Sequence, residues 1–133
     1  MVYCQKKGRD AVLNDLFNEA VEFLNKARAL IVTGDCSIER RDENLQFEKR
    51  YGLKHDQKLR MLLELIPQDC YCIEPNDNPR YEDAMVYKFK HTYDLNSYGE
   101  MEQVSAYIKM YIHEDKTYDK VIVISFHKDR LSN

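Results

Sequence analysis

The chain has 133 residues, of which 44% are hydrophobic and 32% charged, and its formal net charge is -3 at pH 7. This length is typical of one domain, and the composition is that of an ordinary globular protein. The slight acidity excludes a protein that coats DNA through a generally basic surface, so any contact with RNA must use a local patch. Because the sequence has no secretion signal and no long apolar stretch, we expect a cytoplasmic protein without membrane contacts.

Four cysteines, at positions 4, 36, 70 and 72, occur in this chain. Since no secretion signal precedes them, we expect all four thiols to be reduced. Cys70 and Cys72 form a C-x-C pair, but no second pair follows at the spacing of a zinc finger. Phosphate-binding, dinucleotide-binding and zinc-protease motifs are also missing, so the sequence predicts neither a metal site nor a cofactor.

The N-terminal half is predicted to be helical after a flexible tail at residues 1–9. Residues 10–133 are expected to form a single α+β domain. A helix is predicted from Asp10 to Val32 because apolar residues recur there at steps of three and four, at Leu13, Phe17, Ala20, Leu24, Ala27 and Ile31. Gly34 is expected to end this helix. A short extended segment at residues 36–40 and two helices at about 43–51 and 56–65 follow.

The C-terminal half is predicted to form strands. Residues 68–83 are rich in Pro, Asn and Asp and are expected to form a polar loop. Alternating patterns then predict strands at about 84–93, 103–113 and 120–128. Helices followed by consecutive strands indicate an α+β fold, with N-terminal helices packed on one face of an antiparallel three- to four-stranded sheet.

Alternation along these strands predicts that one sheet face collects cationic and aromatic side chains. Lys88 and Lys90 alternate with apolar residues in the first strand, as do Tyr107, Lys109 and Tyr111 in the second. In the third strand we expect Ile122, Ile124 and Phe126 to face the core. Ser125 and His127 are then expected on the open face. Such a surface suits a ligand with phosphates and stacking bases, such as single-stranded RNA.

Five stretches resemble, in order and spacing, motifs of the MqsR-type toxins of type II toxin–antitoxin pairs. N-L-Q-F-E-K-R-Y-G-L resembles the N-L-x-F-L-x-x-L-G-L of that family, and A-Y-I-K-M and V-I-S-F-H resemble two of its strands. The five stretches are Asn44–Leu53, Leu62–Tyr71, Ile73–Arg80, Ala106–Met110 and Val123–His127. Together they span roughly two thirds of the chain, residues 44–128.

The resemblance implies a RelE-like fold, a ribosome-independent mRNA endonuclease and an antitoxin as partner. It also implies a role for Tyr107, which matches a proposed catalytic tyrosine of the family. Well-known members carry lysine and glutamine where this chain has Cys72 and Ala84, and they end in S-F-K where it has S-F-H. Either the imidazole of His127 replaces a family lysine, or this chain no longer cleaves RNA.

Cleavage of RNA without a metal needs a base for the ribose 2′-OH, cations for the phosphate and an acid for the leaving oxygen. A free imidazole titrates near pH 6.5 and suits either proton role. We therefore predict Tyr107, Lys109 and His127 as catalytic residues. The predicted substrate-binding residues are Arg80, Lys88, Lys90, Tyr111 and Lys128, although Lys128 alternates to the core side unless its strand bulges.

The same residues also support two other interpretations. The chain could keep the fold and use the same face to bind RNA or a protein without catalysis. In that case Tyr107 and Tyr111 would only pack against cross-strand neighbours. A third interpretation, an inhibitor of a host system carried by a mobile element, has no positive sign in the sequence. The oligomeric state and the identity of the antitoxin are not encoded in any motif.

Overall fold

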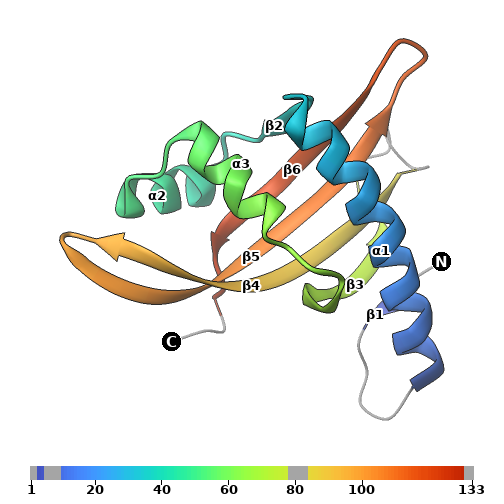
Figure 1. Ribbon diagram of the computed structural model, residues 1–133, viewed down its shortest axis with the longest axis horizontal. Coiled ribbons are helices and arrows are strands. Elements are labelled where there is room, and N and C mark those ends of the chain that lie inside the picture. The colour runs from blue at the N-terminus through green and yellow to red at the C-terminus, as the bar shows by residue number, and fades with distance from the viewer. Residues whose placement is uncertain (1–2, 5–9, 78–83, 131–133) are drawn as a thin grey trace.

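The computed structural model describes residues 3–4, 10–77 and 84–130 and shows an α+β fold (Figure 1). Within these ranges the helices are α1 (Asp10–Val32), α2 (Asp42–Tyr51) and α3 (His55–Leu63), with a 3-10 turn at Pro67–Asp69. The strands are β1 (Tyr3–Cys4), β2 (Cys36–Ile38), β3 (Cys70–Pro75), β4 (Met85–Ser97), β5 (Glu100–Glu114) and β6 (Asp119–Lys128). No helix in the described part is long and apolar enough to cross a membrane.

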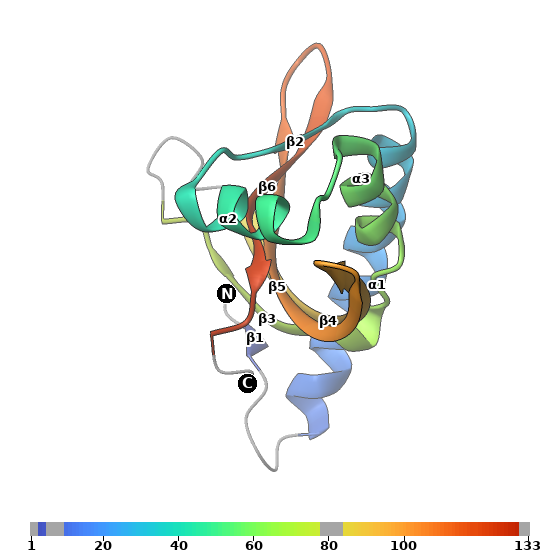
Figure 2. The same ribbon diagram turned by 90° about the vertical axis from the view of Figure 1, so that its left-hand side faces the viewer.

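The described strands form one sheet in the order β1-β3-β4-β5-β6-β2, and α1 and α3 lie on one of its sides (Figure 2). The order β4-β5-β6 follows the chain, as expected for consecutive antiparallel strands. The prediction of a purely antiparallel sheet of three or four strands is wrong. In the described part of the chain six strands take part, and β2 pairs with β6 in parallel.

The two strands β1 and β3 lie in segments that were expected to be irregular. Proline and asparagine become frequent only from Pro75 onward. The residues just before it form β3, in which Cys72 and Ile73 are buried. Tyr3 and Cys4 pair with β3, so the prediction of a flexible tail is wrong for these two residues. Residues 5–9 lie outside the described part of the chain.

A disulfide joins Cys4 of β1 to Cys72 of β3, so the prediction that all four cysteines are reduced is wrong for this pair. The register of the two strands places Cys4 directly opposite Cys72. That pairing spans 68 residues of sequence, and no local pattern reveals it. Cys36 and Cys70 are buried free thiols, and burial raises the pKa of Cys36 to about 11.

Helix α1 supplies the apolar side that covers the sheet. Its buried side chains are Leu16, Ala20, Phe23, Leu24, Ala27 and Ile31. The predicted stripe is therefore correct from Ala20 onward, but Phe17 is 40% exposed and Leu16 takes its place. The side chain of Leu13 lies outside the described part. Phe23 stacks on Tyr87 of β4 with ring centroids 3.8 Å apart, which joins the helix to the sheet.

The alternation predicted for β4 and β5 is confirmed. Phe89 in β4 and Ala106 and Ile108 in β5 are fully buried in the cluster beneath the helices. Strand β6 follows the prediction only in part, because a bulge interrupts its pairing with β5. Lys109 pairs with Ser125 while Met110 pairs with Val123, so Ile124 is an extra residue on the β6 side.

The bulge changes which residues of β6 face the helices. Val121 and Val123 belong to the cluster beneath the helices, whereas Ile122 and Ile124 pack in a second cluster with Val86. The prediction that Ile122 and Ile124 face the main core is therefore wrong. After the extra residue the alternation is shifted by one position, and Phe126 is buried in the main core as predicted.

The side chain of Asn44 in α2 continues the edge pairing of β6 where β2 ends. Its Nδ2 donates to the carbonyl oxygen of Ile124 at 3.0 Å, and its Oδ1 accepts from the backbone N–H of Phe126 at 2.8 Å. Nδ2 also donates to the carbonyl oxygen of Glu39 at 2.9 Å. Asn44 is 5% exposed, so this amide satisfies the carbonyl of the extra residue and the N–H of Phe126, which would otherwise be buried without partners.

We predict that Asn44→Ala lowers the free energy of unfolding by roughly 2–4 kcal/mol, because two strand groups of β6 lose their partner. Urea unfolding followed by circular dichroism measures the change. Gln46→Ala, on the exposed side of the same helix, is the matched control and should leave stability within about 0.5 kcal/mol of wild type. Equal stability of the two variants would contradict the role of Asn44.

Candidate functional site

Three strands place predicted site residues next to one another on the face opposite α1 and α3. Tyr107 of β5 is paired with Lys90 of β4 on one side and with His127 of β6 on the other. The ring centroids of Tyr107 and His127 are 5.4 Å apart, with the planes tilted by 49°. In the next row, Lys109 lies between Lys88 and Ser125. The two rows together form a continuous surface of cationic and aromatic groups.

The first row opens into a hollow of about 370 Å³ between the sheet and the start of α2. Its described lining consists of Arg41, Glu43, Tyr71, Lys90, Tyr107, Ser125, His127, Asp129 and Arg130. Basic side chains outnumber carboxylates in this lining, although the whole chain is acidic. The local charge therefore differs in sign from the global charge, as binding of a polyanion requires.

The imidazole of His127 is held in one orientation by its surroundings. Its Nδ1 lies 2.9 Å from the carbonyl oxygen of Lys128, and a carbonyl only accepts, so Nδ1 carries the hydrogen. In the neutral ring Nε2 is then the acceptor, and it lies 3.7 Å from Oε2 of Glu43. His127 is 9% exposed. This tautomer leaves Nε2 able to take a proton, with a carboxylate beside it.

Glu43, in the first turn of α2, is kept ionised by its neighbour. Arg130 donates from Nε to Oε2 of Glu43 at 3.0 Å and forms a second bond to Oε1. This hydrogen bond is the main reason why the pKa of Glu43 lies below its usual value, and His127 adds to the effect. The negative charge beside His127 is thus retained at mildly acidic pH, where it would stabilise an imidazolium.

Tyr71 of β3 also lines the hollow and lies beside Lys90. The Nζ of Lys90 lies 4.8 Å from the centre of the Tyr71 ring and 3.3 Å from Oδ2 of Asp129. Burial raises the pKa of Tyr71. The charge of Tyr107 and its hydrogen bond with Tyr71 raise this pKa further. Tyr71 therefore stays protonated and forms a pair of linked hydroxyl groups with Tyr107.

Among the described residues, the other predicted side chains do not line the hollow. Lys88 forms an ion pair with Glu74 at 2.6 Å, and Lys109 lies one row away. Tyr111 is 5% exposed and packs with Val86 and Ile124, which leaves little of it for a ligand.

Lys128 is likewise not part of this group. Lys128 lies 3.8 Å from Glu102 and pairs across the strands with buried Ala106, on the helix side of the sheet. The bulge precedes Lys128 but does not bring it to the open face, so Lys128 stays on the core side that its alternation predicts. Arg80 lies outside the described residues.

Sequence reasoning missed six of the hollow's described lining residues as site residues, among them Arg41 and Ser125, although Ser125 was expected on the open face. The other four are Glu43, Tyr71, Asp129 and Arg130. Tyr71 and the stretch beginning at Asn44 were noticed only as parts of the family resemblance. The charged residues Asp129 and Arg130 directly follow the last predicted strand, and this position beside His127 could have indicated them. Their partners on α2 and β3 come from distant parts of the sequence, so spacing alone could not group them.

The chain matches no protein-family model, and a search of curated proteins finds no match either. The assignment of a function therefore depends on the chemistry of the hollow and its surroundings.

We predict that Tyr71 makes the protein sensitive to alkali. Its pKa is raised in the folded state, whereas an unfolded tyrosine ionises near pH 10. Its contribution to stability is therefore complete below about pH 10 and is lost as the pH rises further. The free energy of unfolding of Tyr71→Phe should fall less steeply between pH 8 and 11 than that of wild type, as measured by urea unfolding.

Tyr118→Phe is the control for this comparison, because Tyr118 is 55% exposed. Its pH dependence should equal that of wild type. Identical slopes for Tyr71→Phe and Tyr118→Phe would show that the Tyr71 hydroxyl is not held in its neutral form.

Proposed function

We propose that this chain is an MqsR-like toxin with a RelE-like fold, which cleaves single-stranded mRNA in the cytoplasm and is neutralised by an antitoxin. The observation that carries the proposal is the pairing of Tyr107 with His127 at 5.4 Å within a hollow lined by basic side chains. Helices on one face of the sheet and an open opposite face are compatible with such a fold. The reaction needs neither a metal nor a cofactor.

His127 is proposed as the general base. Its Nε2 takes the proton of the ribose 2′-OH, and the carboxylate of Glu43 at 3.7 Å stabilises the imidazolium that results. The 2′-oxygen attacks the adjacent phosphorus, and the bond from phosphorus to the 5′-oxygen breaks. The products are a 2′,3′-cyclic phosphate and a 5′-hydroxyl end.

Tyr107 is proposed as the proton donor to the leaving 5′-oxygen. Its hydroxyl is hydrogen-bonded to Tyr71, which is protonated and donates to the developing tyrosinate. Both rings also offer flat surfaces on which an unpaired base can stack. Exchange with water then returns the protons of His127 and Tyr107 to their starting positions.

Lys109 is proposed as the principal contact to the phosphate. Lys88 and Lys90 are engaged in ion pairs with Glu74 and Asp129, whereas no carboxylate in the described ranges pairs with Lys109. An ammonium group without a partner gains more from binding a phosphate than one that must first give up a carboxylate. Lys90 then acts as a second, weaker cation at the hollow.

A second candidate function, a binding module without catalysis, is favoured by one observation. His127 is only 9% exposed, and access to its Nε2 requires a ribose to enter the hollow beside Glu43. A chain that only binds RNA or a protein partner would use the same rows of lysine and tyrosine and leave His127 as a packed residue.

Cleavage is tested with purified protein and a labelled single-stranded RNA. We expect wild type to cut the RNA into 2′,3′-cyclic phosphate and 5′-hydroxyl ends, and His127→Ala to be slower by roughly a hundredfold or more. A substrate with 2′-deoxyribose at the cut position should resist cleavage. His55→Ala is the control, because His55 is exposed at the start of α3.

Equal cleavage by His127→Ala and wild type, or cleavage of the 2′-deoxy substrate, would contradict the proposed reaction. Tight binding of RNA by wild type without any cleavage would instead support the binding module.

The role of Lys109 is tested by the salt dependence of RNA binding. We predict that Lys109→Ala weakens binding at low salt and reduces the slope of log K against log salt by about 0.7, the value for one phosphate contact on a single strand. Fluorescence anisotropy with a labelled oligonucleotide measures both effects. Lys116→Ala, in the exposed β5–β6 connection, should change neither the affinity nor the slope, and an equal effect of both variants would exclude a specific contact.

A further inference from the structure

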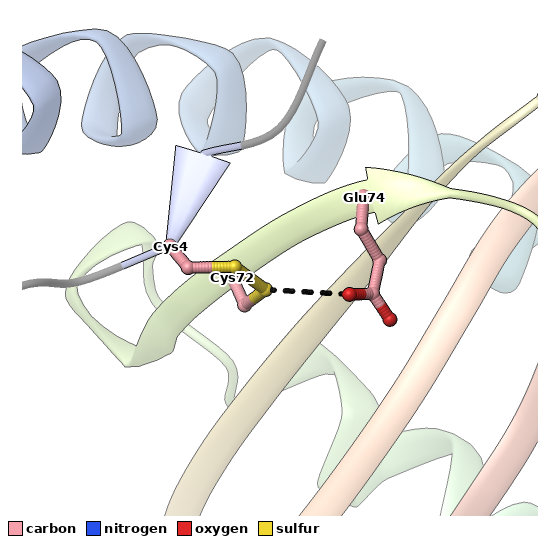
Figure 3. A group of neighbouring side chains, drawn as sticks. All are labelled: Cys4, Cys72 and Glu74. Atoms are coloured by element: carbon pink, nitrogen blue, oxygen red, sulfur yellow. Dashed lines mark hydrogen bonds between the residues drawn. A yellow bond between two sulfur atoms is a disulfide. The ribbon is translucent and has the colours of Figure 1, made fainter.

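Three side chains that could bind a metal ion converge beside β3. Cys4 of β1 and Cys72 and Glu74 of β3 point toward one another (Figure 3), and their candidate ligand atoms lie within 4.8 Å of each other. Cys72 pairs across the strands with Lys88, so the group lies on the same side of the sheet as the two rows of the candidate site. None of the three side chains lines the hollow of the candidate site.

The carboxylate of Glu74 is held so that one oxygen faces the sulfur atoms. Its Oε1 accepts from Nζ of Lys88 at 2.6 Å, while its Oε2 lies 3.9 Å from Sγ of Cys72. The two oxygens therefore have separate partners. An outer cation that orients a ligating carboxylate in this way is common at metal sites, because it fixes the direction of the remaining oxygen.

We propose that Cys4, Cys72 and Glu74 bind a zinc ion when the disulfide is reduced. Two thiolates and one carboxylate suit Zn²⁺, whereas Mg²⁺ and Ca²⁺ take oxygen ligands only. Water completes the four-coordinate site. Cys4 and Glu74 are partly exposed, which leaves a path for the ion, and Cys72 is 5% exposed.

A dithiol reductant converts the disulfide state into the reduced state that binds zinc. The reductant gives two electrons and two protons to the Cys4–Cys72 disulfide and becomes a disulfide itself. Zinc then replaces the two thiol protons, which pass to water. Oxidation by a disulfide of the same class reverses the sequence and releases the ion.

Both states hold β1 against β3, but only one of them holds an ion. The disulfide links the strands directly, and the zinc ion links them through Cys4, Cys72 and Glu74. The N-terminal strand thus stays attached under reducing and oxidising conditions, and the protein takes up zinc only under reducing ones. This behaviour is independent of RNA cleavage, so its failure and the failure of the proposed function are separately visible.

The experiment measures zinc bound to the full chain after reduction with a dithiol, equilibration with zinc and removal of unbound metal. We expect about one zinc ion per reduced chain and none per oxidised chain, by elemental analysis. Cys4→Ser, Cys72→Ser and Glu74→Gln should each reduce the affinity at least tenfold, as measured by competition with a chromogenic chelator. Circular dichroism verifies that each variant is folded.

Cys36→Ala is the matched control, because Cys36 is a buried thiol away from the three ligands. It should bind zinc as wild type does. The proposal is overturned if reduced wild type binds no zinc, if Cys4→Ser or Glu74→Gln binds zinc as tightly as wild type, or if Cys36→Ala loses affinity to the same extent as they do.

Discussion

The extra residue at Ile124 determines which way the end of β6 faces, and the candidate site depends on it. Val121 and Val123 face the helices, so strict alternation would turn His127 inward as well. The bulge shifts the alternation by one position, which buries Phe126 and places His127 beside Tyr107. Asn44 binds the carbonyl of the extra residue Ile124 and the backbone N–H of Phe126. A single buried amide on α2 thus connects the fold to the chemistry of the open face.

The charges around the hollow are largely paired, which fits a site that discriminates among ligands. Glu43 is bound to Arg130, and Asp129 to Lys90, so the local positive charge is modest. In the proposed complex with RNA, Lys109 and the flat rings of Tyr71 and Tyr107 would contribute more to binding than the general electrostatic field of the protein. A weakly acidic protein can bind RNA by such means, since the contacts act at short range.

Much of the fold was predictable because it is encoded locally. The bounds of α1 follow from its apolar periodicity and from Gly34, whose φ of 84° ends the helix. The faces of β4 and β5 follow from alternation, but the position of His127 beside Tyr107 depends on the bulge. Strand β1, strand β3, the disulfide and the bulge depend on partners distant in sequence. The contacts of Glu43 with His127 and Arg130 arise in the same way, so no spacing rule could reveal them.

The central claim is that Tyr107 and His127 form one outward-facing site that contacts RNA, and NMR on the intact protein tests it most directly. We predict nuclear Overhauser effects between the Tyr107 ring and the His127 imidazole, whose centroids are 5.4 Å apart. Addition of a short single-stranded RNA should shift the signals of both rings and leave exposed His55 on α3 unchanged. Absence of the ring contact, or RNA-induced shifts confined to the helix side of the sheet, would contradict the account.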